Sequence, residues 1–153
     1  MKLRLFLFLA FTFVVAQGFR PEKNLGPATP GPDDFLVKHN APPEVRRMFA
    51  VACYDCHSDR TRYPWYADFQ PVGWWLAQHV REGKDELNLS TLGAAGPKKQ
   101  ARRTEAMIDE IKDLKMPLPS YTWTHRDAVF TPAQRQELLG WLEAVLAKLT
   151  TEE

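Results

Sequence analysis

Two cysteines and a histidine within five residues constrain this chain more than any other feature of its sequence. Residues 53–57 read Cys-Tyr-Asp-Cys-His and contain both cysteines of the chain. This is the attachment pattern for covalently bound haem, because one helical turn places two thiols under the two porphyrin vinyl groups and the next residue presents an imidazole to the iron. The sequence therefore predicts one haem c, attached through Cys53 and Cys56, with His57 as the proximal iron ligand.

Three other uses of the cysteine pair are disfavoured. A disulfide between Cys53 and Cys56 would close a very small loop and would stabilise the fold little. A thioredoxin-like redox pair would follow a strand in a βαβ setting, and this sequence has a helical pattern instead. A zinc site would need a fourth ligand and would require adjacent Cys56 and His57 to share one tetrahedron. Covalent haem is therefore the favoured interpretation.

The first 19 residues have the pattern of an export element, with two basic residues followed by an apolar run over 5–19. The run is shorter than the roughly 17 to 25 residues of a full membrane span, and Ala16 with Gly18 offers a signal-peptide cleavage site. Arg20 directly after the run favours an uncleaved anchor instead. We favour the anchor. Both alternatives place the rest of the chain outside the cytoplasm, on the periplasmic side of a bacterial inner membrane or free in the periplasm.

The remainder predicts a linker followed by one all-α domain. Residues 20–43 are rich in proline and are expected to form a linker without regular structure. The domain over residues 44–150 is expected to contain about four helices. Apolar spacing and capping residues place them over 44–53, 73–83 and 97–115, and in a last stretch that begins with Thr131 and Pro132. The long loops between them would be unusual in a small bundle unless a cofactor filled its centre.

The second axial ligand of the iron is less constrained than the first. Met116 ends the third predicted helix, and Pro117 after it discourages further helix, so a thioether could face His57 from a loop. From the residues alone, Met116 could equally fill a gap in the core. The competing candidates are weaker because they lie on predicted helix faces, in the linker or in an exposed loop: His39, Met48, His79, Met107 and His125.

Polar and aromatic residues directly after the motif could line the haem rim. Arg62 and Trp65 fall within nine residues of His57. A guanidinium or an indole N–H there could pair with haem propionates, whose charges need partners when partly buried. A solvated arginine is the alternative.

Several runs beyond the motif resemble the bacterial haem-binding domain family of monohaem cytochrome c-like proteins. They are the sequences TRYPWY at 61–66, QPVGWW at 70–75 and MPLPSYT at 116–122. The similarity covers nearly the whole chain after Pro21. It implies a membrane-anchored periplasmic domain with a cytochrome c-like helical fold. By the same resemblance, the MPLPSYT run looks like a distal methionine loop, which favours Met116 as the second ligand.

We expect a one-electron carrier that works with an unidentified redox partner protein, rather than a catalyst. The alternative is a five-coordinate haem peroxidase or gas sensor that would use His79, Arg81 or His125 on the open side of the iron. The formal net charge of +1 gives no electrostatic reason to expect a nucleic-acid partner.

Overall fold

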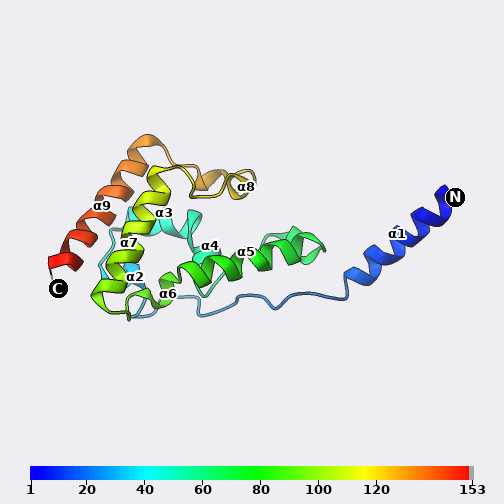
Figure 1. Ribbon diagram of the computed structural model, residues 1–153, viewed down its shortest axis with the longest axis horizontal. Coiled ribbons are helices and arrows are strands. Elements are labelled where there is room, and N and C mark those ends of the chain that lie inside the picture. The colour runs from blue at the N-terminus through cyan, green and yellow to red at the C-terminus, as the bar shows by residue number, and fades with distance from the viewer. Residues whose placement is uncertain (152–153) are drawn as a thin grey trace.

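The computed structural model describes residues 1–151, and this part of the chain is helical. These residues form no β-strand, and one isolated antiparallel bridge joins Leu25 and Arg60. The long helices are α1 (Lys2–Ala16), α3 (Pro43–Ala52), α5 (Val72–Glu86), α7 (Pro97–Lys112) and α9 (Pro132–Thr151) (Figure 1). The short helices are α2 (Phe35–Lys38), α4 (Tyr54–His57), α6 (Leu89–Leu92) and α8 (Pro119–Thr122), with 3₁₀ turns η1 (Trp65–Asp68) and η2 (Arg126–Ala128). The predicted all-α class is confirmed.

The four helices expected in the domain all form, with shifted ends. The start of α9 has the predicted cap, because Thr131 Oγ1 accepts a hydrogen bond from Gln134 N at 3.2 Å and the Gln134 side chain accepts one from Thr131 N at 3.0 Å. Helix α5 runs on past Gly83 to Glu86. Helix α7 ends at Lys112 rather than at 115, because Leu114 adopts a left-handed backbone with φ 59° that cannot continue a right-handed helix.

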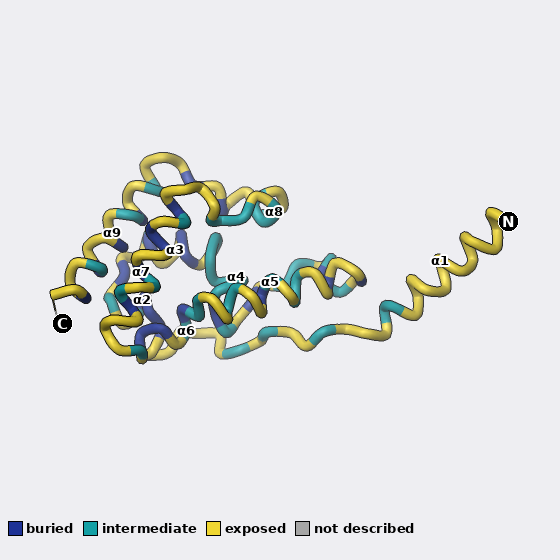
Figure 2. The backbone as a smooth tube through the Cα atoms, in the orientation of Figure 1, coloured by how far each residue is buried: buried dark blue, intermediate teal, exposed yellow. Residues whose placement is uncertain are grey.

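The hydrophobic core lies between α2, α3, α7 and α9. Helices α7 and α9 pack against each other, and apolar residues from α3 fill the space beside them, including Met48 and Phe49 (Figure 2). Met48 and Met107 are both buried in this core, as their helix positions predicted. Burial of each large side chain stabilises the fold by about 1.5–3 kcal/mol.

The core also extends into the stretch that was expected to be a linker. Helix α2 forms within 20–43, and its Phe35 and Leu36 are buried. The helix begins there because buried Asp34 caps it, accepting hydrogen bonds from the backbone N–H groups of Leu36 at 2.9 Å and Val37 at 3.2 Å. The expectation of no regular structure over this whole stretch was therefore wrong for its last part.

The earlier part of the same stretch is extended and packs against the loop after the Cys-x-x-Cys-His motif. Asn24 donates to the carbonyl of Ser58 at 2.9 Å and accepts from Thr61 N at 3.0 Å. Gly26 N donates to Asp59 O at 2.7 Å, and a Cβ on Gly26 would clash with that same carbonyl. These contacts fix the chain directly after the motif.

Helix α1 extends away from the helical domain and buries none of its residues there (Figures 1 and 2). A helix is therefore present where the sequence predicted a signal or anchor helix, and its role as an anchor stays a prediction. Within residues 1–151, no helix combines the length and the apolar character that crossing a membrane requires.

Candidate functional site

The Cys-x-x-Cys-His motif forms the junction between α3 and α4. Cys53 follows the last residue of α3, and α4 carries the rest of the motif. His57 N donates to Cys53 O at 2.9 Å, so the motif closes one helical turn and its two cysteines lie on neighbouring positions of one face. Both cysteines are free thiols. The local backbone is therefore the one that the spacing predicted.

Both thiols are held in an apolar setting. Burial raises the pKa of Cys53 to about 12, with a smaller contribution from the charge of Cys56. Burial also raises the pKa of Cys56 to about 11, with a smaller contribution from Asp55. The raised pKa values disfavour the thiolate form that a nucleophilic cysteine uses.

The His57 ring is oriented by helix α5 and by the residue that follows it. Its Nδ1 lies 2.8 Å from the carbonyl oxygen of Gly83 and 3.1 Å from that of Leu87. Carbonyl oxygens only accept hydrogen bonds, so Nδ1 carries a proton, and in the neutral ring Nε2 then keeps its lone pair. A carbonyl on one ring nitrogen is the usual arrangement for a histidine whose other nitrogen binds a metal.

Helix α5 reaches this position because residue 83 is glycine. A Cβ on Gly83 would lie 2.7 Å from the carbonyl oxygen of Cys56 and 3.1 Å from its Cβ. The backbones of α5 and α4 therefore touch directly, which brings the Gly83 carbonyl within hydrogen-bond distance of His57. In the sequence, residue 83 appeared only as the end of the predicted helix over 73–83, and this contact was not predicted.

Two hollows flank His57. The first, of about 210 Å³, is lined on one side by Cys56 and Gly83 and on the other by the loop at 116–118. The second, of about 390 Å³, is lined by Cys53 and by apolar residues of α3 and α7 such as Phe49 and Met107. Both hollows share Ala52, His57, Glu86 and Met116 in their walls. Together their volumes fall within the range of about 300–1,000 Å³ that is usual for a ligand site.

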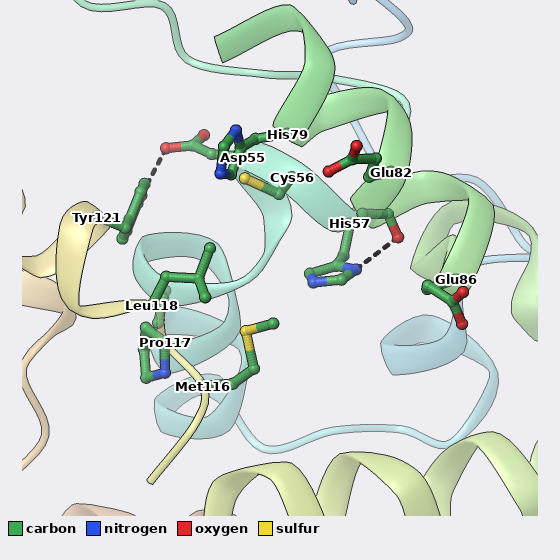
Figure 3. Close-up of a pocket in the computed structure, with 12 residues that line it drawn as sticks. Asp55, Cys56, His57, His79, Glu82, Glu86, Met116, Pro117, Leu118 and Tyr121 are labelled. Carbon is green, nitrogen blue, oxygen red and sulfur yellow. Dashed lines mark hydrogen bonds between the residues drawn. The ribbon is translucent and has the colours of Figure 1, made fainter. Parts of the chain in front are cut away.

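Met116 lies across the hollow from His57. Its side chain points toward the His57 ring from the opposite wall (Figure 3). The loop that carries it is held by the hydrogen bond from Met116 N to Glu110 O at 3.2 Å. The structure thus brings together four of the six residues predicted for the site: Cys53, Cys56, His57 and Met116.

The two residues inside the motif are tied to distant segments. Tyr54 donates its hydroxyl to the buried Asp34 carboxylate at 2.8 Å. The buried carboxylate of Asp55 accepts hydrogen bonds from the Arg62 side chain at 3.1 Å and from the Tyr121 hydroxyl at 2.7 Å. Burial and the bond to Asp55 raise the pKa of Tyr121, and the bond to Asp55 raises the pKa of Arg62.

Arg62 and Trp65, the other two predicted site residues, lie in neither hollow. The Arg62 guanidinium is engaged by Asp55, and Trp65 in η1 is 77% exposed. Their pairing with haem propionates stays a prediction. Among the competing ligands, His79 lines the first hollow with its ring 4.2 Å from that of Trp75, whereas His125 stacks on Tyr121 outside both hollows. Arg81 also lies outside them.

The site contains further residues that sequence reasoning did not single out. Asp55 and Tyr121 line the first hollow, as do the acidic side chains of Glu82 and Glu86 (Figure 3). Tyr121 belongs to the MPLPSYT run, which was the available signal for it. Nothing local in the sequence distinguishes Glu82 and Glu86 from other exposed acidic residues of a helix.

Comparison with known proteins agrees with this geometry. A family model described as a haem-binding domain matches residues 11–144. No curated protein and no solved structure matches the chain. The family match covers most of the chain and includes the motif, both hollows and the Met116 loop. The chain belongs to the haem-binding domain family.

Proposed function

We propose that this protein binds one haem covalently, as haem c, and transfers single electrons on the periplasmic side of the inner membrane. One observation carries the proposal. His57 has its Nδ1 proton engaged by Gly83, and its Nε2 is free beside a hollow whose opposite wall holds Met116. The proposed fold around the haem is cytochrome c-like.

The donor set matches the chemistry of haem c. Cys53 and Cys56 are free cysteines one helical turn apart, and each thioether bond would consume one S–H by addition across a vinyl group. His57 Nε2 and the Met116 sulfur are a nitrogen and a soft thioether donor, which low-spin haem iron accepts as an axial pair. When bound, the haem supplies the Fe(II)/Fe(III) couple.

The chain's own residues would then set the properties of that couple. A methionine opposite a histidine raises the reduction potential relative to two histidines. Apolar side chains such as Leu118 and Ala52 exclude water from the walls of the hollow. With both axial positions filled by protein, substrate would have no open coordination site, which favours a carrier over a catalyst.

A five-coordinate haem peroxidase or gas sensor is the second candidate. The observation in its favour is that His79 also lines the first hollow, where Nδ1 bonds the Trp75 carbonyl at 2.9 Å and leaves Nε2 available. Rapid binding of carbon monoxide to the ferrous protein as isolated would support this candidate. Slow binding that requires displacement of Met116 would support the carrier.

Haem attachment is tested on full-length protein produced with cytochrome c maturation factors. Intact mass and a pyridine haemochrome spectrum should report one haem that acidified organic solvent does not extract. Complete extraction of the pigment would refute the thioether bonds and with them the proposal.

The second ligand is tested with a near-isosteric pair of variants. Met116→Leu should abolish the methionine-sulfur charge-transfer absorption of the ferric protein. Met107→Leu, which alters the only other methionine in the walls of the two hollows, should retain it. Loss of the band in the Met107 variant alone, or in neither variant, would refute Met116 as the ligand.

We also propose that α1 stays uncleaved and holds the protein at the membrane. Its apolar residues are exposed along the whole helix and contribute nothing to the domain core. Intact mass of the membrane fraction would show whether residues 1–19 remain, and protease added to spheroplasts should digest the domain from outside. A redox partner protein is expected and is unidentified.

A further inference from the structure

Exposed aromatic and apolar side chains gather where η1 meets the start of α5. Five of them, called here the aromatic patch, are Trp65, Phe69, Val72, Trp74 and Trp75. Their exposed fractions range from 38% for Val72 to 77% for Trp65. Trp65 and Phe69 contact each other edge to face at 6.0 Å between ring centroids. Side chains of this size are costly to leave in water, and an exposed cluster of them marks an interaction surface.

The end of α1 lies against this patch. Gln17 and Gln70 exchange two hydrogen bonds, from Gln70 N to Gln17 Oε1 at 2.9 Å and from Gln17 Nε2 to Gln70 O at 3.3 Å. The Trp74 indole N–H donates to Phe19 O at 2.6 Å. In Figure 1 the C-terminal end of α1 and the N-terminal end of α5 accordingly lie close together, whereas α9 occupies the opposite end of the molecule.

Helix α1 is short compared with the hydrocarbon core of a bilayer. Its 15 residues give a helix about 22 Å long, shorter than the roughly 30 Å hydrocarbon core of a bilayer. Tryptophan and other aromatic rings favour the headgroup region, where an apolar ring and a polar N–H are both accommodated. The patch is placed where a membrane that receives α1 would meet the domain.

We propose that the aromatic patch inserts into the lipid headgroup region beside α1, so that the domain itself rests on the membrane. The inference depends on the proposed membrane attachment through α1 and not on haem binding. The same helix connects the patch to the candidate site, because Gly83 lies 11 residues after Val72, about 16 Å along the axis of α5. The patch would thus hold the motif near the membrane and outside it.

Lipid contact is tested by photolabelling of the full-length, haem-loaded protein. The chain is reconstituted into vesicles of phosphatidylcholine and phosphatidylglycerol in which one lipid carries a diazirine in its headgroup and another carries one on the acyl chain, and labelled peptides are identified by mass spectrometry. Label in α1 and in residues 65–75, with none in α9, is the expected result. Label in α1 alone would overturn the inference and leave the attachment through α1 standing. Absence of label from both would overturn both.

A matched pair of double variants tests the contribution to binding. Phe69→Ser/Trp74→Ser removes two exposed side chains of the patch, and Leu114→Ser/Val129→Ser removes two that are 59% and 54% exposed elsewhere. The first variant should lower the vesicle partition coefficient by about tenfold, and the second by less than twofold. Equal effects of the two variants would overturn the inference. Haem content is measured on each, and if the patch variant fails to load haem, the photolabelling of the unaltered chain decides.

Discussion

Gly83→Ala is the sharpest perturbation of the candidate site that the structure offers. The added methyl group would lie 2.7 Å from the carbonyl oxygen of Cys56, where an ordinary contact begins at about 3.4 Å. The obstacle is a backbone atom of the Cys-x-x-Cys-His motif itself, so no side-chain rotation relieves it. Helix α5 must therefore move away from α4 by several tenths of an ångström.

Two effects of opposite sign determine how much Gly83→Ala changes the free energy of unfolding. Overpacking of this kind costs about 1–3 kcal/mol, and the lengthened hydrogen bond between His57 Nδ1 and Gly83 O, now 2.8 Å, adds to the cost. Alanine in place of glycine within a helix stabilises the helix by about 1 kcal/mol. The net expectation is a loss of about 1–2 kcal/mol in the free energy of unfolding.

Gly140 provides the matched control, because it also lies inside a helix and a Cβ there would meet nothing within 4 Å. Gly140→Ala should raise the free energy of unfolding by about 0.5–1 kcal/mol, since only the helix-propensity effect remains. Urea unfolding of the haem-loaded proteins, followed by far-UV circular dichroism, measures both. If Gly83→Ala stabilises the protein as much as Gly140→Ala does, the argument for a required α4–α5 backbone contact is refuted.

Three further predictions concern the polar contacts around the motif. Tyr54→Phe removes the hydroxyl bond to the buried Asp34 carboxylate and should lower the free energy of unfolding, measured in urea, by about 1.5–3 kcal/mol; an unchanged value would show that the bond is not stabilising. Tyr121→Phe should cost about 1–2 kcal/mol in the same assay, whereas a neutral effect would mean that Asp55 is satisfied by its other partners. Lys84 holds the pKa of Asp59 below its ordinary value of 3.8. Asp59→Asn should therefore destabilise the protein at pH 7 and lose its effect as the pH falls below that value; a difference from wild type that persists at lower pH would contradict this.

The sequence predicted the long helices well because their signals are local. The apolar stripe of α9 and its Thr131 cap, for example, need no information from elsewhere in the chain. Helix α2 was missed because its four residues make too short a pattern, and a proline-rich setting obscured them. Phe35 is part of the core because it packs against Trp141 of α9, which also contacts Phe49 of α3, and only the folded chain reveals these contacts.

In the candidate site, too, the features that are local in the sequence were predicted, and those that depend on distant contacts were not. The motif and the methionine loop were visible as short runs, and the structure brings His57 and Met116 to the same two hollows. Arg62 was predicted at the haem rim because it is near in sequence; the contact with Asp55 was not predicted, and pairing with a propionate stays a prediction. The role of Gly83 depends on a contact between residues 27 positions apart and could not be deduced from either residue alone.

Three separate segments hold the motif, and each acts on a different residue of it. Asp34 of the α2 cap binds Tyr54, Tyr121 of α8 binds Asp55, and Gly83 of α5 orients His57. Each contact is made by a segment more than 19 residues away in the chain, so the geometry of the two cysteines and the histidine is a property of the assembled fold. A group bound across both hollows would contact both α5 and the loop that carries Met116. Because it would bind only the folded state, it would shift the unfolding equilibrium toward that state. If haem is attached as proposed, the thioether bonds would make that stabilisation independent of haem concentration, since the cofactor could not dissociate.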